Sequence, residues 1–128
     1  MTNAQRDLLR RAYKRLDASR YLHEGGFFDD AVSRAYYAMA HGAEAALLKY
    51  EMTPNTHKGL QTQFGKQFVK TGTFPPKMGR NLRRIFDLRQ KADYSGADLT
   101  DDTVQNVIER AATFVQTIES YLEGASDA

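Results

Sequence analysis

The chain has 128 residues, 41% hydrophobic and 27% charged, with a net charge of +2, a composition typical of one globular domain. No apolar run approaches the roughly 20 residues of a membrane span, and the N-terminus lacks a signal-peptide pattern, so we expect a cytoplasmic protein without membrane contact. The absence of cysteine excludes disulfides and zinc–thiolate sites, and three widely spaced histidines give no metal-ligand pattern, so we expect no metal and no cofactor.

Apolar residues at helical spacing predict four long helices and one short one, and no segment alternates long enough to predict a strand. The expected helices are about 3–24, 28–50, a short helix capped by Thr56, 76–93 and 100–124, with turns at 25–26 and 94–97. The predicted fold class is all-α, an up-and-down helical bundle of four long helices plus one short helix. We expect one domain, 1–124, followed by a frayed tail, 125–128.

One face of the helix expected at 28–50 carries almost only small residues. They are Ala31, Ala35, Ala38, Gly42, Ala45 and Ala46. Small residues at three- and four-residue spacing let another helix approach closely. We therefore expect this helix to be the central and most buried one.

Arg89 and Asp93 interrupt the apolar face of the helix expected at 76–93, which also carries Leu82 and Ile85. Charged groups are almost never fully buried unless they are paired, and a spacing of four residues allows these two to pair. A buried ion pair is weak evidence for stability. The pair therefore indicates either a ligand site or a structural contact that fixes how the helices meet.

A polar stripe also runs along the helix at 28–50, formed by Arg34, Tyr37, His41 and Glu44 at spacings of three, four and three. Arg34 and His41 are about 10 Å apart along the helix axis. They could bracket a phosphate or meet their symmetry mates in a dimer. Alternatively, His41 is a half-buried histidine and Arg34 packs its aliphatic stem over the bundle.

The charge is distributed unevenly along the chain. Residues 1–91 hold 17 Lys and Arg against 8 Asp and Glu, whereas residues 92–128 hold one basic residue against 8 acids. The acidic last helix could complement the basic ones, or the basic part could form an anion-binding surface. The sequence leaves both interpretations open.

Four segments together resemble the small stand-alone prokaryotic HEPN domain family. They are residues 31–41 (AVSRAYYAMAH), 57–60 (HKGL), 64–72 (FGKQFVKTG) and 87–94 (DLRQKADY). The resemblance covers about residues 7–123, and its most specific parts are the Ser-Arg-Ala-Tyr-Tyr and Arg-x-x-Ala-Asp-Tyr motifs. The family's five-helix bundle agrees with the all-α prediction made from periodicity.

The resemblance implies a nucleotide- or RNA-associated module, often a homodimer and often encoded beside a minimal nucleotidyltransferase in a two-gene toxin–antitoxin-type system. Tyr37, His57, Arg89 and Asp93 would then lie around an anionic ligand. In related systems the nucleotidyltransferase transfers AMP to a tyrosine just beyond the catalytic motif. Tyr94 lies at a similar position and is a candidate for this modification.

Some HEPN proteins are metal-independent ribonucleases that use an arginine followed four to six residues later by a histidine. No histidine follows Arg89 in this chain, whereas Arg34 and His41 have a six-residue gap on an earlier helix. Metal-free RNA cleavage needs a group with near-neutral pKa and a cation to stabilise the phosphorane charge. The sequence therefore argues against a strong nuclease centred on Arg89.

Three hypotheses follow. The first is a non-catalytic or weakly catalytic HEPN binding module with a minimal nucleotidyltransferase partner. The second is a metal-independent ribonuclease toxin with Arg34 and His41 as catalytic residues. The third is a structural interaction module without a ligand site, in which Arg89 and Asp93 only fix the helix packing.

Overall fold

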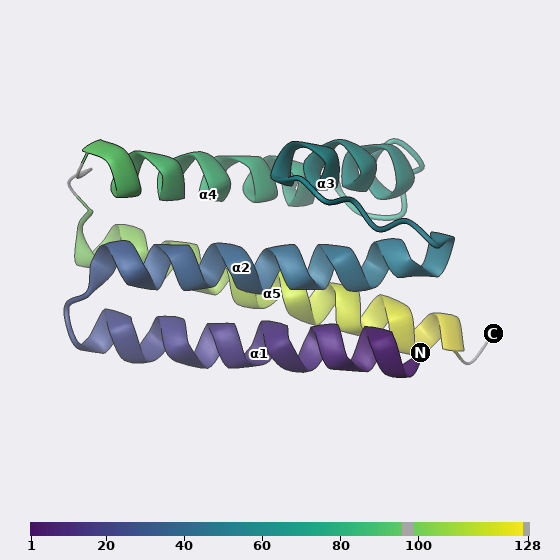
Figure 1. Cartoon of the computed structure of the whole chain (residues 1–128), viewed down its shortest axis with the longest axis horizontal. Coiled ribbons are helices and arrows are strands. Elements are labelled where there is room, and N and C mark those ends of the chain that lie inside the picture. The colour runs from purple at the N-terminus through teal and green to yellow at the C-terminus, as the bar shows by residue number, and fades with distance from the viewer. Residues whose placement is uncertain (96–98, 127–128) are drawn as a thin grey trace.

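The computed structural model describes residues 1–95 and 99–126, which form helices and no strand (Figure 1). The helices are α1 (Asn3–Glu24), α2 (Phe28–Leu47), the short α3 (His57–Phe64), α4 (Pro76–Ser95) and α5 (Asp101–Ser126). A 3-10 turn, Leu48–Tyr50, follows α2, and a π-helical turn, Gly65–Val69, follows α3. The predicted all-α fold class is confirmed. Within the described ranges, no helix is long and apolar enough to cross a membrane.

Capping side chains start three of these helices where the sequence predicted. At α1, the Thr2 hydroxyl accepts from the Gln5 backbone N–H (3.1 Å) and the Thr2 N–H donates to the Gln5 side chain (2.9 Å). The Thr56 hydroxyl accepts from the Gly59 N–H at the start of α3 (2.9 Å), and Thr100 caps α5 in the same way (3.1 Å). These contacts satisfy backbone donors that have no partner within the helix.

The α-helical part of α2 ends earlier than expected. Its last α-helical residue is Leu47, and the chain continues as a 3-10 turn to Tyr50. The end is sharp because Glu51 adopts a left-handed backbone conformation with a φ of 57°. Such a cap is usually glycine, so the sequence carried no clear signal for it.

Both late helices run further than expected. Helix α4 continues to Ser95, so Tyr94 is helical rather than part of a turn, and residues 96–97 of that expected turn lie outside the described residues. Helix α5 passes Gly124 and continues to Ser126. A glycine costs only about 1 kcal/mol in a helix and does not by itself stop one. Residues 127–128 of the expected tail are also outside the described residues.

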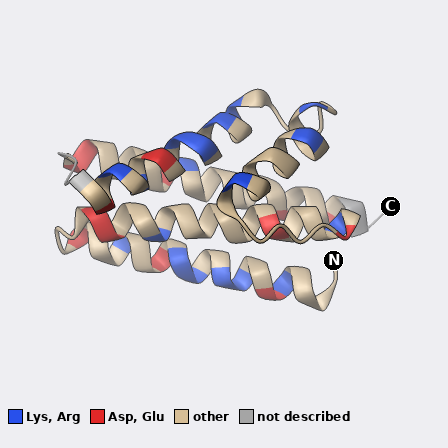
Figure 2. Cartoon of the chain, turned by 45° about the horizontal axis from the view of Figure 1, so that its top comes forward, with Lys and Arg blue, Asp and Glu red and all other residues tan. Residues whose placement is uncertain are grey.

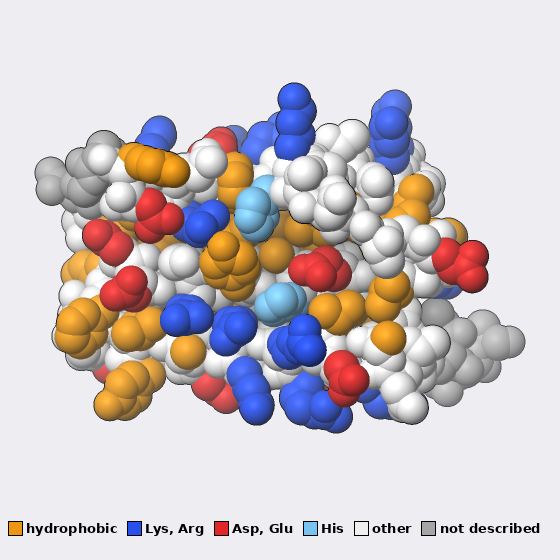
Figure 3. Space-filling model, viewed as in Figure 1, with side chains coloured by type: hydrophobic (Ala, Val, Ile, Leu, Met, Phe, Trp, Pro, Cys, Tyr) orange, Lys and Arg blue, Asp and Glu red, His pale blue; other side chains and the backbone are white. Residues whose placement is uncertain are grey.

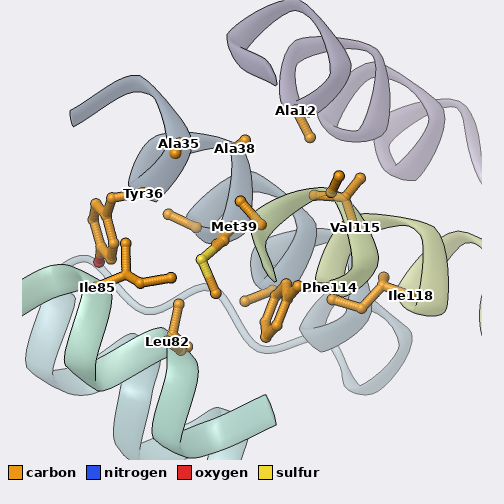
Figure 4. Packing of buried hydrophobic residues seen from close by; sticks show 14 of the residues in the cluster. Ala12, Ala35, Tyr36, Ala38, Met39, Leu82, Ile85, Phe114, Val115 and Ile118 are labelled. Carbon is orange, nitrogen blue, oxygen red and sulfur yellow. The ribbon is translucent and has the colours of Figure 1, made fainter. Parts of the chain in front are cut away.

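Helix α2 is the centre of the molecule, as the small-residue face predicted. It packs against α1, α5, α4 and α3, and its small-residue face is buried. Consecutive long helices run in opposite directions (Figure 1). They do not surround the core evenly, because α4 packs mainly on α2 and contacts α5 little. In Figure 4, Met39 of α2 lies between Leu82 and Ile85 of α4 and Phe114 of α5.

Two buried side chains set how α1 lies along α2. The Gln5 amide donates to the carbonyl of Ala45 (3.2 Å), and the Ser19 hydroxyl donates to the carbonyl of Ala31 (2.6 Å). Both polar side chains lie on the otherwise apolar face of α1, where an unpaired polar group would be costly. The two bonds therefore hold the antiparallel pair in one register.

Gly42 of α2 offers a test of the packing against α5. A Cβ atom at this position would lie 3.5 Å from Ile118 Cδ1 and 3.6 Å from Val115 Cγ2, which is ordinary contact. We expect Gly42→Ala to raise the free energy of unfolding by about 0.5–1 kcal/mol, because alanine restricts the unfolded chain and favours the helix. Gly42→Leu should lower it by about 1–3 kcal/mol through overpacking. Urea denaturation measures both, and a stable Gly42→Leu variant would contradict close α2–α5 packing.

Candidate functional site

The candidate site lies where the outer stripe of α2 meets the start of α3 and the second half of α4. The structure brings together Tyr37 from α2, His57 from α3 and Arg89 from α4, all expected ligand-binding residues. Figure 3 shows pale-blue histidine side chains in the middle of this face, with cationic side chains and an acidic one near them. The site is therefore built from three separate segments of the chain.

Arg89 is held in an aromatic environment rather than by a close ion pair. Its guanidinium carbon lies 4.9 Å from the ring centre of Tyr37 and 5.9 Å from that of Tyr36, distances at which a cation is attracted by the ring face. The Arg89 side chain is only 20% exposed. Its Nε is buried and has no hydrogen-bond partner. The guanidinium charge is thus largely desolvated and only weakly compensated.

Asp93 lies at the edge of this arrangement, not on the buried face where the sequence placed it. Its Oδ2 is 3.6 Å from Arg89 Nε, too long for a hydrogen bond, and its side chain is 42% exposed. The expected pair therefore exists as a long ion pair between a mostly buried arginine and an exposed carboxylate. Its neighbour Ala92 is buried, so the buried face of α4 reaches that residue but leaves the Asp93 side chain accessible.

His57 is fixed by Tyr36 and by aromatic packing. Its Nδ1 shares a hydrogen bond of 2.8 Å with the Tyr36 hydroxyl, and its ring centre lies 5.0 Å from that of Phe86. Burial, and then the charge of Arg89, lower the pKa of His57 below the usual 6.5, although Glu44 opposes the shift. At neutral pH the imidazole is therefore mainly uncharged and can accept a hydrogen bond or a proton.

Tyr36 itself was expected only as a core residue. It is fully buried, and burial raises the pKa of Tyr36 to about 12, so its hydroxyl keeps its proton. The sequence did contain a signal for its second role. A tyrosine on a buried helix face needs a hydrogen-bond partner for its hydroxyl, and a histidine is a suitable one.

A small pocket opens beside this cluster. It has a volume of about 270 Å³ and is enclosed by α2, the loop before α3 and α3 itself. Its lining residues are Tyr37, Ala40, His41, Glu44, Pro54, Asn55, Thr56, His57 and Leu60. Apolar walls with a few polar groups are typical of small-molecule sites, and this volume is near their lower limit.

His41 lines this pocket, whereas Arg34 does not. His41 is mostly buried, and its Nδ1 lies 3.4 Å from Glu44 Oε1 without forming a hydrogen bond. Arg34 is exposed and makes no hydrogen bond or ion pair within residues 1–95 and 99–126. The two residues expected as a catalytic pair therefore lie in different surroundings. Tyr94 is 89% exposed and lies outside the pocket.

The chemistry of the site suits an anion attached to a flat ring. The cation of Arg89 attracts the anion, while Tyr37 and the pocket walls offer apolar contact. Glu44 and His41 can hydrogen-bond the edge of a ring inside the pocket. In the part of the chain that the structure describes, no three His, Asp or Glu side chains are grouped to hold a metal ion.

Known proteins resemble this chain over nearly its whole length. The HEPN domain pattern matches residues 5–121. A Methanocaldococcus jannaschii protein named "Putative toxin" is 36% identical over 116 residues, which cover 91% of this chain and 87% of the relative. A Gloeobacter violaceus protein of the group UPF0332 is 36% identical over 124 residues, 95% and 98% of the two chains. The match over residues 5–121 shows that this chain belongs to the HEPN domain family.

Proposed function

We propose that this protein is a HEPN-type nucleotide- or RNA-binding module, and that residues 1–124 act as one unit. Tyr37, His41, His57 and Arg89 would bind a nucleotide, with Asp93 at the edge of the site. The observation that carries the proposal is Arg89, a largely buried cation whose Nε has no hydrogen-bond partner, beside a small pocket. A phosphate is the group that such a cation recognises best.

A purely structural role for Arg89 is less well supported. An ion pair retained to fix helix packing would be expected to be short and to satisfy its donors. The Arg89–Asp93 distance of 3.6 Å and the exposure of Asp93 fit that role poorly. The part of the Arg89 side chain that stays exposed remains available to an anionic ligand, which would partly offset the cost of burying the charge.

We further propose that the protein forms a homodimer and works with a minimal nucleotidyltransferase in a two-gene toxin–antitoxin-type system in the cytoplasm. The name of the Methanocaldococcus relative supports the toxin part of this proposal. The exposure of Tyr94, at 89%, supports its role as the acceptor of an AMP group, because an enzyme must reach the hydroxyl.

One observation favours a second function, a metal-independent ribonuclease. His57 from α3 and Arg89 from α4 both lie against the ring of Tyr37, although no histidine follows Arg89 along α4. A neutral His57 could take the proton of a 2′-hydroxyl as its oxygen attacks the phosphorus, while Arg89 stabilises the phosphorane charge. The bond from phosphorus to the 5′-oxygen then breaks, leaving a 2′,3′-cyclic phosphate, and the 5′-oxygen takes a proton from the imidazolium of His57 or from water. His57 and Arg89 fit this chemistry better than Arg34 and His41, because both contact the Tyr37 ring, whereas Arg34 is exposed and has no such contact.

The binding proposal predicts that Arg89→Ala weakens the binding of AMP by about ten- to a hundredfold, the effect of losing a charged hydrogen bond. Isothermal titration calorimetry measures the affinity. Arg83→Ala is the matched control, because Arg83 is exposed on the opposite face of the same helix and should leave the affinity unchanged. If Arg89→Ala changes only the free energy of unfolding and leaves AMP and partner binding intact, the residue is structural.

The two functions predict different fates of RNA in cells. Binding alone predicts intact RNA on expression of the wild type, His57→Ala and His41→Ala. RNA breakdown that disappears with His57→Ala and persists with His41→Ala would establish the ribonuclease. Its rate should then fall only as the pH drops below 6.5, because the lowered pKa keeps His57 in its basic form at neutral pH.

The modification proposal predicts an AMP group on Tyr94 when the protein is co-expressed with a minimal nucleotidyltransferase from its own operon. Mass spectrometry of the purified protein should locate the group on Tyr94 and find none in Tyr94→Phe. Tyr21, which is 77% exposed, is the matched control for general accessibility. Equal labelling of Tyr21 and Tyr94 would show that the transfer does not select this position.

A further inference from the structure

A second group of cations borders the site on its other side, on α1. The two hydrogen bonds between α1 and α2 join Gln5 to Ala45 and Ser19 to Ala31. At this antiparallel register, Arg15 is level with Arg34, and Arg11 is level with the segment between Tyr37 and His41.

Both arginines also lie on the correct flank of α1. Tyr13 reaches α5, where its hydroxyl donates to Glu119 (2.7 Å). At 100° per residue, Arg11 and Arg15 lie nearly opposite Tyr13, hence on the flank beside the exposed stripe of α2. Figure 2 shows the row of Lys and Arg along α1, and in Figure 3 cationic side chains border the central histidine.

These arginines differ from others on the same helix in having no partner. Arg10 is paired with Asp7 (2.7 Å) and Arg20 with Asp17 (3.6 Å). Arg11, Arg15 and Arg34 make no hydrogen bond or ion pair within the described ranges. Three unpaired cations close together raise one another's energy, and a bound anion would relieve this repulsion.

The pocket therefore has cations on both sides, Arg89 on α4 and the group Arg11, Arg15 and Arg34 on α1 and α2. Between them the pocket itself carries a carboxylate, Glu44, which repels phosphate and suits the hydrogen-bond donors of a base. A mononucleotide has a phosphate on one side of its base only. A nucleic acid strand has one on each side.

We propose that Arg11, Arg15 and Arg34 form a second phosphate subsite, so that the ligand is a single-stranded RNA which crosses the exposed stripe of α2 with one base in the pocket. This inference rests on the proposed function, since it adds a subsite to the same nucleotide site. The stripe from Arg34 to Glu44 is about 15 Å long, enough for a few nucleotides.

The test compares two double variants with the same loss of charge on the same helix. Arg11→Ala/Arg15→Ala removes the subsite, and Arg10→Ala/Arg20→Ala removes the paired arginines. Fluorescence anisotropy measures binding of a labelled RNA of about eight nucleotides over a range of salt concentrations. Calorimetry measures binding of AMP, and thermal unfolding checks that both variants fold.

We expect Arg11→Ala/Arg15→Ala to weaken RNA binding by about tenfold and to reduce the slope of log affinity against log salt by about 1.4, or about 0.7 for each lost phosphate contact. Its affinity for AMP should not change. Arg10→Ala/Arg20→Ala should bind both ligands like the wild type.

If both double variants weaken RNA binding equally, the loss of net charge alone explains the effect, and the subsite proposal is overturned. The proposal is also overturned if Arg11→Ala/Arg15→Ala binds RNA like the wild type but no longer binds the nucleotidyltransferase partner. That result would assign these arginines to a protein contact. In either case AMP binding that depends on Arg89 would leave the proposed function standing. If the wild type binds neither AMP nor RNA, the proposed function fails and the subsite fails with it.

Discussion

The burial of α2 is the constraint on which the rest of the structure depends. Its alanines and Gly42 let α1 and α5 approach closely, and α4 and α3 cover another side. Beyond the first turn of α2, only Ser33 and the stripe from Arg34 to Glu44 stay accessible. Polar side chains of a central helix are costly to bury, so they lie on the face that the other helices leave uncovered. The packing that stabilises the core therefore also determines where a ligand can reach α2.

Arg89 illustrates the energetic compromise at this stripe. A guanidinium that is only 20% exposed loses much of its hydration, and the two tyrosine rings together with a long ion pair replace it only in part. Burial, and then the same charge, lower the pKa of His57. Arg89 thus offers attraction for anions and also favours the neutral form of its neighbour, and such shifted groups are typical of functional sites.

Local signals predicted most of the fold. The Thr56 cap, the Gly25–Gly26 stop and apolar periodicity predicted the helices, because these effects act over a few residues. The misplaced ends have equally local reasons. Glu51 adopts a left-handed backbone conformation that is usually found at glycine, so its residue type did not predict the end of the helix. Gly124 lies inside α5 and did not end it. The inward direction of Arg89 followed from periodicity, whereas periodicity did not predict the exposure of Asp93.

The sequence by itself determined the all-α class and the central position of α2. Only the tertiary structure decided that His57 and Arg89 share the Tyr37 ring, that Tyr36 hydrogen-bonds His57, and that Arg34 and His41 lie in different surroundings. The reason is physical: periodicity describes which face of one helix a residue occupies, but contacts between helices depend on register and rotation that the whole core sets together.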